Sequence, residues 1–507
     1  MRKFLKILTG RFLFITILLL IEIVVVVGGS YLLTTRFLPA FYFYLLCIAG
    51  GLVLTVYIIN SDINAEYKIA WLVPILVFPP FGVPIYLLLR RRKPRRKLKV
   101  LLRDYGRMSC LYKELPDISE RFAESGDFDA LCAEFVSEHG YLTPSDCFEY
   151  EYFSTGETFG AKLEDELAKA QKYIFLEYFV ISEGKFWNRV FTILCDKAAK
   201  GVDVRVIYDD IGSMKGVPAD FAAKLEKKGI KCLCFNRFRP VLDVGQNNRT
   251  HRKIAVIDGI TAFTGGINIA DEYTNEIELH GHWKDTGVMV RGRATQNFTA
   301  MFLQLWGLKS AGENYTQYLT ECPPGKYLCL PFSDMPFENN TNICEDLYLR
   351  IIYNAKKYVY INTPYLIIDS EMKRALVTAA HSGVDVRITV PHIPDKKYVF
   401  AVTKAFYTQL LKEGIKIYSY TPGFIHAKSI VSDDRYALIG SSNMDFRSFY
   451  LHCECDIMFF EKEIADKLKE DYLNTCDECE LVTEKKNKAN IFTRMYRSIL
   501  RIFAPLM

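Results

Sequence analysis

The chain has 507 residues, which is enough for several ordinary domains with sizeable cores, and half of its residues are hydrophobic. Its net charge at pH 7 is only +5, so it lacks the overall positive field expected of a protein that binds nucleic acid. The apolar residues are unevenly spread, and three long apolar runs lie within the first ninety residues.

The three apolar runs cover residues 12–35, 37–59 and 69–89, and each is about long enough to cross the hydrocarbon core of a bilayer. The first run differs from a cleaved signal peptide. Its apolar part is too long, no small-x-small cleavage site follows it, and a second apolar run comes directly after it. We interpret this run as a retained membrane anchor.

Basic residues lie on both sides of the apolar region, before residue 12 and again at 90–99. The positive-inside rule places both groups in the cytoplasm, whereas three complete spans would separate them. The third run contains four prolines between residues 74 and 84, which break a helix and force an irregular path. The sequence therefore predicts, for residues 1–90, two transmembrane helices and a third Pro-rich, re-entrant or interfacial segment. The protein is then a multi-pass protein of the cell membrane, with its catalytic part on the cytoplasmic side.

Two further segments carry basic charge beside apolar residues. Residues 91–150 form a basic linker and helical region, and the basic run at 90–99 suits anionic lipid head groups as well as marking topology. Residues 481–507 form a basic amphipathic tail, with apolar side chains at helical spacing and arginines elsewhere on the helical wheel. Such a helix fits a membrane interface or the protein's own body, and the sequence favours neither.

Past residue 150 the chain alternates strand-like and helix-like segments, which is typical of α/β architecture, and it does so twice. YIFLEYFVI at 173–181 matches YVYINTPYLII at 358–368, and GVDVRVIYDD at 201–210 matches GVDVRITVPH at 383–392. We predict two tandem halves, residues 151–320 and 321–480. The connection FNRFRPVLDVGQNNRT is about ten residues longer than its counterpart, which makes it a candidate lid or substrate-contacting loop.

Each predicted half contains one polar frame of histidine, one residue, lysine, four residues and aspartate. The frames are His251, Lys253 and Asp258 in the first half, and His426, Lys428 and Asp433 in the second. Histidine and lysine two apart on a strand point to the same face. The aspartates lie at the turn of a predicted hairpin, so they fit a capping role as well as a place among the catalytic residues.

An asparagine follows each histidine by 17 residues, behind a run of small residues. These are Asn268 after Gly266, and Asn443 after Ser442. A single His-x-Lys is usually a surface strand, but two matched copies with the same asparagine spacing indicate a site. We expect the asparagines and the small residues to contact the substrate.

Two histidines, two lysines and two amide side chains that converge would form a cationic pocket suited to a phosphodiester. A neutral histidine attacks phosphorus, and a protonated one gives its proton to the leaving alcohol. With an unperturbed pKa near 6.5, both forms are accessible at cell pH. Asp285 and Glu454 follow the two asparagines and are candidates for orienting the imidazoles.

No cluster of Asp, Glu and His at metal-binding spacing is evident, so we predict no metal and no cofactor. The fourteen cysteines are scattered, and their close pairs have no histidine at zinc-finger spacing. We interpret them as buried free thiols in a reducing compartment.

The segments HRKIAVIDG with TGGIN, and IHAKSIVSDD with IGSSNMDFRSF, resemble the two signature motifs of the phospholipase D superfamily. YDDIGS, GGINIADEY, HWKDTG and TPYLIID are similar to bacterial cardiolipin synthases, as is the membrane segment before the basic run. The resemblance implies two α/β/α sandwich halves with pseudo-twofold symmetry behind N-terminal transmembrane helices.

This resemblance also implies an activity. One phosphatidylglycerol forms a phosphatidyl-histidine intermediate and releases glycerol, and a second phosphatidylglycerol attacks to give cardiolipin. It implies His251 as nucleophile and His426 as acid and base, although the residues alone do not rank them. The implied partners are phospholipid and membrane, without nucleic acid, and an oligomer is compatible with the sequence.

Other functions stay open at this point. A membrane-bound phospholipase D would use the same residues with water as acceptor and release phosphatidic acid. A superfamily nuclease is disfavoured by the membrane anchor and the modest charge. A membrane scaffold with an inactive domain is disfavoured because both frames are intact.

Overall fold

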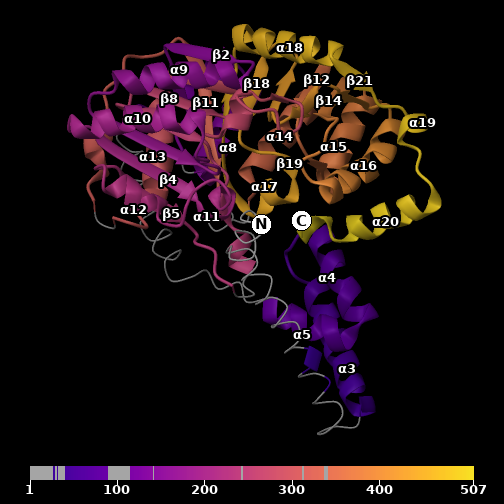
Figure 1. The fold of residues 1–507 in the computed structure, drawn as a ribbon. Helices are drawn as coiled ribbons and strands as arrows, with labels where there is room; N and C mark the ends of the chain where they lie inside the picture. The colour runs from indigo at the N-terminus through magenta and orange to yellow at the C-terminus, as the bar shows by residue number, and fades with distance from the viewer. Residues whose placement is uncertain are drawn as a thin grey trace. The chain divides into compact units, whose positions relative to one another are not determined.

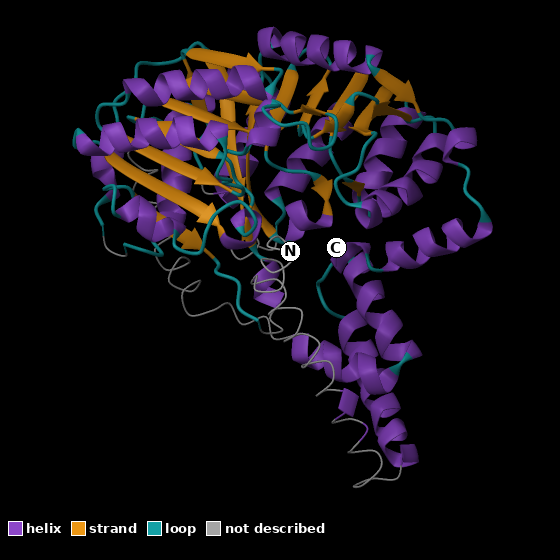
Figure 2. Ribbon diagram, viewed as in Figure 1, coloured by secondary structure: helices purple, strands orange, loops and turns teal. Residues whose placement is uncertain are grey.

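The computed structural model describes residues 27–28, 31, 40–89, 115–140, 142–240, 244–310, 313–335 and 341–506 (Figures 1 and 2). Most of the first apolar run and the whole basic run at 91–99 lie outside these residues, so the predictions made for them stay predictions. The chain divides into two units. One contains the N-terminal helices up to residue 89, and the other is the α/β body that carries both polar frames.

The N-terminal unit contains three described apolar helices, α3 (Ala40–Ile59), α4 (Ala65–Val77) and α5 (Pro79–Leu89). Of the described helices, α3 alone is long and apolar enough to cross a membrane, over Tyr42–Ile59, which matches the second predicted span. The third apolar run folds as two short helices that meet at Phe78, because prolines interrupt it. At 13 and 11 residues, α4 and α5 are each shorter than the roughly 20 residues that a span needs.

The three helices pack on one another through a small apolar core of Leu54, Ile58, Ile75, Val83 and Tyr86. A Cβ atom on Gly82 would lie 2.2 Å from the carbonyl oxygen of Pro74, so glycine permits the close approach of α5 to α4.

In the first half of the body, a seven-stranded sheet has the order β2-β10-β8-β7-β3-β4-β5. The strands are β2 (Glu149–Phe153), β3 (Tyr173–Tyr178), β4 (Asp203–Asp209), β5 (Lys231–Phe235), β7 (Ile254–Ile257), β8 (Thr261–Gly265) and β10 (Gly287–Arg291). Strands β3, β4 and β5 are parallel, and the others join antiparallel. The helices are α9 (Gly156–Lys169), α10 (Lys185–Ala199), α11 (Asp210–Ser213), α12 (Phe221–Glu226) and α13 (Ala294–Trp306).

The second half is built on a ten-stranded sheet whose main path is β1-β11-β20-β18-β17-β12-β14-β15-β21. Its strands are β1 (Ser145–Cys147), β11 (Tyr327–Asp334), β12 (Tyr358–Asn362), β14 (Asp385–Pro391), β15 (Lys416–Tyr420), β17 (Ser429–Ser432), β18 (Tyr436–Gly440), β20 (His452–Phe459) and β21 (Cys479–Leu481). The helices are α14 (Ile343–Asn354), α15 (Ser370–His381), α16 (Lys397–Lys412), α17 (Phe446–Tyr450), α18 (Lys462–Asp477), α19 (Glu484–Asn487) and α20 (Ile491–Ile502). Two helices, α7 (Ser119–Ser125) and α8 (Asp127–Gly140), precede β1.

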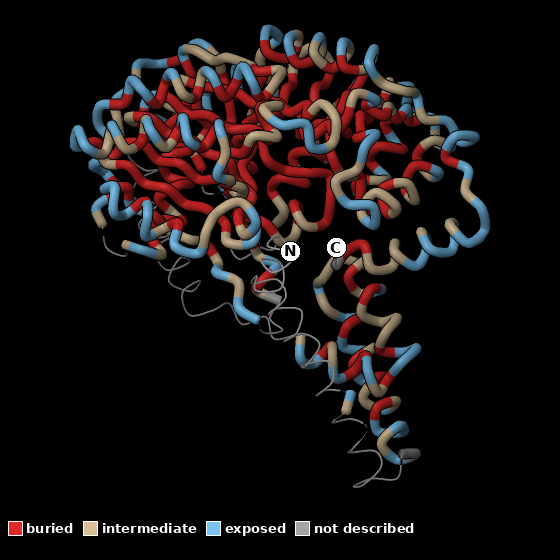
Figure 3. The backbone as a smooth tube through the Cα atoms, viewed as in Figure 1, coloured by how far each residue is buried: buried red, intermediate tan, exposed pale blue. Residues whose placement is uncertain are grey.

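The two halves repeat one topology, as the sequence predicts. The parallel set β12-β14-β15 corresponds to β3-β4-β5, and the antiparallel hairpin β17-β18 corresponds to β7-β8. The register is the same, since Ile254 pairs with Thr264 in one hairpin and Ser429 with Ile439 in the other. Buried residues fill both sheets, while buried and exposed residues alternate along the outer helices (Figure 3).

Short strands exchanged between the halves hold them together and position the site. Strand β6 (Arg249–Thr250) of the first half pairs in parallel with β20 of the second. In return, β16 (Gly423–Ile425) of the second half pairs in parallel with β9 (His282–Lys284) of the first. Each exchanged strand ends directly before one of the frame histidines.

Candidate active site

The two frame histidines lie at equivalent places, each against a strand of the opposite half. The backbone N–H of His251 donates to the carbonyl of Cys453 at 2.9 Å, and that of His426 donates to the carbonyl of Lys284 at 2.7 Å. Both side chains are buried, at 6% exposed. The strand exchange therefore fixes each histidine backbone before any side-chain contact is considered.

A carboxylate from the opposite half contacts the Nδ1 atom of each histidine. For His251, Nδ1 lies 2.9 and 3.0 Å from the two carboxylate oxygens of Glu454. For His426, Nδ1 lies 2.6 Å from Oδ2 of Asp285. A carboxylate at Nδ1 holds the proton there and leaves Nε2 as the atom free to react. The structure thus contains the expected carboxylate beside each imidazole. Each histidine is paired with a carboxylate from the other half of the body.

The two frame lysines are buried beside their histidines. Lys253 Nζ donates to the carbonyl of His251 at 2.6 Å, and Lys428 Nζ lies 2.8 Å from His426 Nδ1 and also contacts the carbonyl of His426. Burial lowers the pKa of Lys253 to about 8 and that of Lys428 to about 7. When protonated, these side chains are cations that lack full solvation, which favours an anionic ligand.

The frames share one electrostatic environment. Burial lowers the pKa of His251 well below its usual range, and Lys253, Lys428 and His426 lower it further. Burial and Lys428 lower the pKa of His426 to about 4, although Asp285 opposes them. Both imidazoles are therefore neutral at pH 7, and the expectation that both protonation states are accessible at cell pH is wrong for these buried side chains.

The predicted amide and small residues line the same region in different ways. Asn268 Oδ1 accepts from the N–H of Val180 at 2.9 Å, while its buried Nδ2 has no hydrogen-bond partner within the described part of the chain. Asn443 is 4% exposed, and its N–H donates to Ser448 Oγ at 3.1 Å. Asn268 therefore retains a donor for a ligand, as a substrate contact requires.

The small residues before the asparagines make room for carboxylates. A Cβ atom on Gly266 would lie 2.1 Å from Asp285 Oδ1, so any larger residue would displace that carboxylate. In the second half the hydroxyl of Ser441 donates to Glu454 Oε2 at 2.5 Å, while the N–H of Ser442 donates to Asp456 Oδ1 at 3.1 Å. Gly266 and Ser441 thus help to orient the carboxylates, a role that sequence spacing had not indicated.

The frame aspartates, Asp258 and Asp433, lie at the far ends of β7 and β17 from the histidines. Asp258 has a φ of 55° in the hairpin turn, and its carboxylate accepts from the N–H groups of residues 171, 172 and 173. Asp433, with a φ of 54°, accepts in the same way from residues 356, 357 and 358. Both carboxylates therefore cap the start of a strand, and the place of these residues among the catalytic residues stays a prediction.

Replacing Asp258 with alanine is expected to destabilise the body while leaving the chemistry of the folded fraction nearly unchanged. Three charge-assisted hydrogen bonds to backbone N–H groups are lost, which we expect to cost about 2–4 kcal/mol of unfolding free energy. The check is a lower Tm in detergent, together with a turnover per folded molecule within a few-fold of wild type. A turnover loss as large as that of a histidine variant, at unchanged Tm, would place Asp258 among the catalytic residues.

Comparison with known proteins places this site in a family. A family model described as "Cardiolipin synthase, PLD-like domain" matches residues 163–306 and 348–475, more than half of the chain. A second model, "Phospholipase_D-nuclease N-terminal", matches residues 52–91. The chain belongs to the cardiolipin synthase family.

Individual relatives agree with this assignment. A protein named cardiolipin synthase 2 from Bacillus anthracis is 34% identical over 87% of this chain and 86% of its own, and an uncharacterized protein of Streptococcus mutans is 38% identical over 89% and 99%. A cardiolipin synthase from Geobacillus thermodenitrificans is 34% identical over 87% and 88%. The crystal structure of phosphatidylserine synthase from Haemophilus influenzae shares the fold, with a TM-score of 0.57, 13% identity, and coverage of 74% of this chain and 98% of its own. Membership of this family and the apolar helix α3 associate the protein with membranes and with lipid substrates.

Within this cardiolipin synthase fold, several site residues escaped the sequence analysis. His452 lies two residues before Glu454 on β20, with its ring centre 5.3 Å from that of His251, and Arg447 Nε donates to its Nε2 at 3.3 Å. Trp283 takes the equivalent place beside His426, also at 5.3 Å. The available signal was the alternation of β20, since residues two apart on a strand share a face. The asymmetry gives the His251 side a second imidazole and the His426 side an indole.

One group of side chains in the described residues has ligand atoms close enough for a metal ion. His251, His452 and Glu454 each offer one atom, and these atoms lie within 4.8 Å of one another. The buried ammonium groups of Lys253 and Lys428 lower the pKa of neighbouring basic groups, and the same repulsion opposes a divalent cation. We therefore interpret the group as a carboxylate that is hydrogen-bonded to His251, with the second imidazole, His452, 3.6 Å from it.

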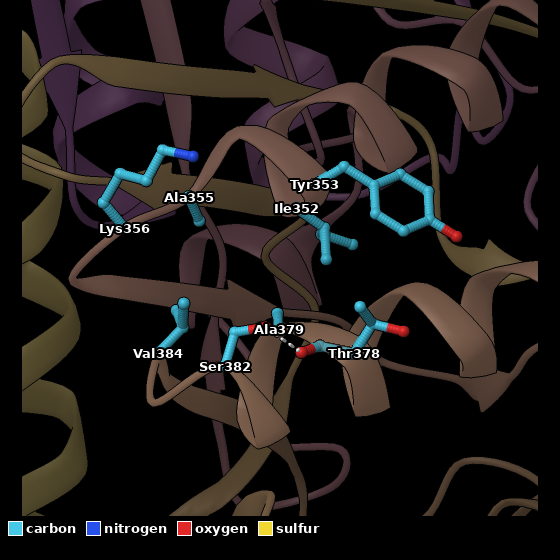
Figure 4. Close-up of a pocket in the computed structure, with 8 residues that line it drawn as sticks. All are labelled: Ile352, Tyr353, Ala355, Lys356, Thr378, Ala379, Ser382 and Val384. Atoms are coloured by element: carbon cyan, nitrogen blue, oxygen red, sulfur yellow. Dashed lines mark hydrogen bonds between the residues drawn. The ribbon is translucent and has the colours of Figure 1, made fainter.

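A surface pocket lies elsewhere, at the start of strands β12 and β14 (Figure 4). Ala355, Lys356 and Val384 precede these strands, while Ile352 and Tyr353 come from α14 and Thr378 and Ser382 from the end of α15. This edge carries Asp433, whereas His426 lies at the opposite end of β17. The pocket is therefore separate from the histidines.

The buried histidines predict a loss of stability in acid. Burial lowers the pKa of His452 to about 3, with Arg447 and His251 acting in the same direction. Between pH 6.5 and 3 the unfolded chain then binds a proton at this residue that the folded chain does not, so this contribution to stability falls as pH falls. Each pKa unit of difference between the folded and unfolded states changes the unfolding free energy by about 1.4 kcal/mol.

The measurement is Tm in detergent at pH 7 and pH 4.5 for wild type and for His452→Asn. We expect the acid-induced decrease to be smaller in the variant by several degrees. The exposed His381 serves as a matched control, because His381→Asn should leave the decrease unchanged. Buried acids such as Asp334, whose pKa burial raises to about 7, act in the opposite direction, and the comparison of variants cancels them. Equal decreases in wild type and His452→Asn would contradict the prediction.

Proposed function

We propose that this protein is a phosphatidyltransferase that makes cardiolipin from two molecules of phosphatidylglycerol, through a phosphatidyl-histidine intermediate. The observation that carries the proposal is the pair of buried imidazoles, each held at Nδ1 by a carboxylate from the other half. Transfer between two alcohols needs one nucleophile and one proton carrier, and two oriented imidazoles provide both.

In the first step, Nε2 of one neutral histidine attacks the phosphorus of phosphatidylglycerol. The bond from phosphorus to the head-group glycerol oxygen breaks, and the protonated second histidine gives that oxygen its proton. The products are glycerol and a phosphatidyl-histidine. The anionic phosphodiester adds negative charge between Lys253 and Lys428, which raises the pKa of the histidines and allows the acid to be protonated.

In the second step, the other histidine, now neutral, takes a proton from the terminal hydroxyl of a second phosphatidylglycerol. The resulting oxygen attacks phosphorus, the bond from phosphorus to Nε2 breaks, and cardiolipin leaves. Lys253, Lys428 and Asn268 stabilise the charge on the phosphoryl oxygens in both steps. We assign His251 as nucleophile and His426 as acid and base, because the motif that contains His251 resembles the first motif of the family.

We also propose a location. The protein is a multi-pass protein of the cell membrane with its α/β body at the cytoplasmic face, because the basic residues on both sides of the apolar region favour that side. The helix α3 supplies one span, and the two short helices α4 and α5 suit a re-entrant or interfacial path. Phospholipid is the partner, and no nucleic acid is needed.

The test is the full chain reconstituted in vesicles that contain labelled phosphatidylglycerol. We expect one glycerol for each cardiolipin, with no added metal or nucleotide. Phosphatidic acid as the main product would instead identify a hydrolase. Cardiolipin that forms only when phosphatidylethanolamine is added would identify a different second substrate.

A further inference from the structure

The C-terminal helix α20 (Ile491–Ile502) presents an apolar face to the outside of the body. Asn490 caps its first turn, accepting from the N–H of Thr493 at 2.8 Å. Five large apolar side chains are about half exposed or more, and no residue of the helix is buried. They are Ile491 at 74%, Phe492 at 75%, Met495 at 59%, Tyr496 at 51% and Ile499 at 49%.

The opposite side of α20 packs on the body through arginines. The guanidinium of Arg501 lies 4.7 Å from the ring centre of Phe406 on α16. Arg497 Nη1 donates to the carbonyl of Asn487 at 3.4 Å, and burial lowers the pKa of Arg497. A surface helix of a soluble protein normally does the reverse, with apolar residues against the body and charges in water. This orientation leaves those five side chains as an exposed apolar stripe, which must be covered by a membrane or by a protein.

The chemistry around the stripe identifies the cover as a bilayer surface. Helix α20 contains no acidic residue, and the exposed Lys485, Lys488 and Arg494 lie before or beside the apolar stripe. Such charges complement anionic head groups, while Phe492 and Tyr496 are the kind of aromatic side chains that favour the interface. The same chain carries α3, which is long and apolar enough to cross a membrane and would keep a bilayer near. A second copy of the chain would bring equal positive charge to the contact, which disfavours it.

We propose that α20 is a monotopic helix that lies in the membrane interface, with Ile491, Phe492, Met495, Tyr496 and Ile499 in the acyl region and the arginine side against the body. It attaches the α/β body to an anionic membrane at a second point besides α3. The proposal does not depend on the reaction that the body catalyses.

Photo-crosslinking of the full chain in vesicles tests this placement. Phe492→p-benzoylphenylalanine, in vesicles of phosphatidylglycerol and phosphatidylcholine, should give phospholipid adducts as the main product after illumination. The matched control within the helix is Arg501→p-benzoylphenylalanine, because Arg501 lies against Phe406 of the body and a crosslinker there should react within the chain. A second control is Tyr353→p-benzoylphenylalanine on α14, an aromatic position that is 54% exposed and should give few lipid adducts.

Replacing phosphatidylglycerol by phosphatidylcholine alone should lower the lipid adducts at position 492 several-fold, because the basic flank loses its partner. Peptide crosslinks at position 492, to the same chain or to a second copy, would overturn the proposal and identify a protein as the cover. Lipid adducts at position 492 no more frequent than at position 353 would overturn it as well. Neither result bears on whether cardiolipin is made.

Discussion

Cardiolipin formation is expected to fall by about 10³- to 10⁴-fold when either His251 or His426 is replaced by alanine. His251→Ala removes the proposed nucleophile, and His426→Ala removes the group that carries the proton to and from the alcohol. The rate losses of two residues that act as one unit do not add, so the double variant should be at most a few-fold slower than the slower of the two single variants. The measurement is initial rate of labelled cardiolipin release in vesicles.

The same variants can separate the two roles. With His251 as nucleophile, His426→Ala protein denatured in SDS at neutral pH should retain labelled phosphatidyl group on histidine, because the intermediate forms slowly and is transferred to the acceptor more slowly still. His251→Ala should retain none. The reverse labelling would exchange the roles without harming the two-step scheme, whereas full activity in either variant would contradict it.

A histidine far from the frames provides the control for these experiments. His381 lies at the end of α15, is 60% exposed at its side chain and pairs with Glu413 at 2.9 Å. His381→Ala should leave the rate within about two-fold of wild type, since surface substitutions of this kind have small effects. The Tm of each variant in detergent shows whether a lost rate reflects lost folding.

The second large effect is expected at the carboxylates that cross between the halves. Asp285→Asn and Glu454→Gln keep the size of the side chain but remove the negative charge at Nδ1 of His426 and His251. The amide neither favours the imidazolium nor holds the reactive tautomer, so we expect kcat to fall by about 10²- to 10⁴-fold, with a smaller change in KM. Loss of the Asp285 charge should also lower the pKa of His426 further, because this carboxylate opposes the effects of burial and Lys428.

The pH profile distinguishes orientation of the imidazole from simple loss of structure. In Asp285→Asn, the limb of the kcat profile that reports the protonated acid should move to lower pH. Glu166 is a matched buried carboxylate outside the site, which pairs with Lys169 and Arg291. Glu166→Gln should lower Tm without moving the pH profile. An Asp285→Asn enzyme with normal kcat and an unchanged profile would show that the contact with His426 is structural only.

Many features of the fold were predictable because they follow from local patterns. The Asp258–Gly259 dipeptide between apolar strands predicts the hairpin that forms β7 and β8, and its repetition at Asp433 predicts the second. The prolines between residues 74 and 84 predict the interruption between α4 and α5. The 17-residue spacing from histidine to asparagine recurs because both halves repeat one hairpin and its register.

Other features depend on contacts between distant parts of the chain. The pairs His251–Glu454 and His426–Asp285 join residues 203 and 141 positions apart, and the exchange of β6 and β16 decides which carboxylate meets which imidazole. Spacing alone is equally compatible with pairing inside each half. The same holds for Ser441, which donates to Glu454, and for His452 beside His251.

The sequence by itself identifies the residue types, the repeat and thus the phosphodiester chemistry, because these follow from which residues are present and how they are spaced. Tertiary structure decides the charge of those residues, the partner of each, and the direction in which α20 faces. The physical reason is burial. Desolvation makes both histidines neutral and weakens the basicity of both lysines, and it depends on everything packed around them. The packing of Arg497 and Arg501 against the body likewise leaves the apolar face of α20 outward, which a helical wheel does not reveal.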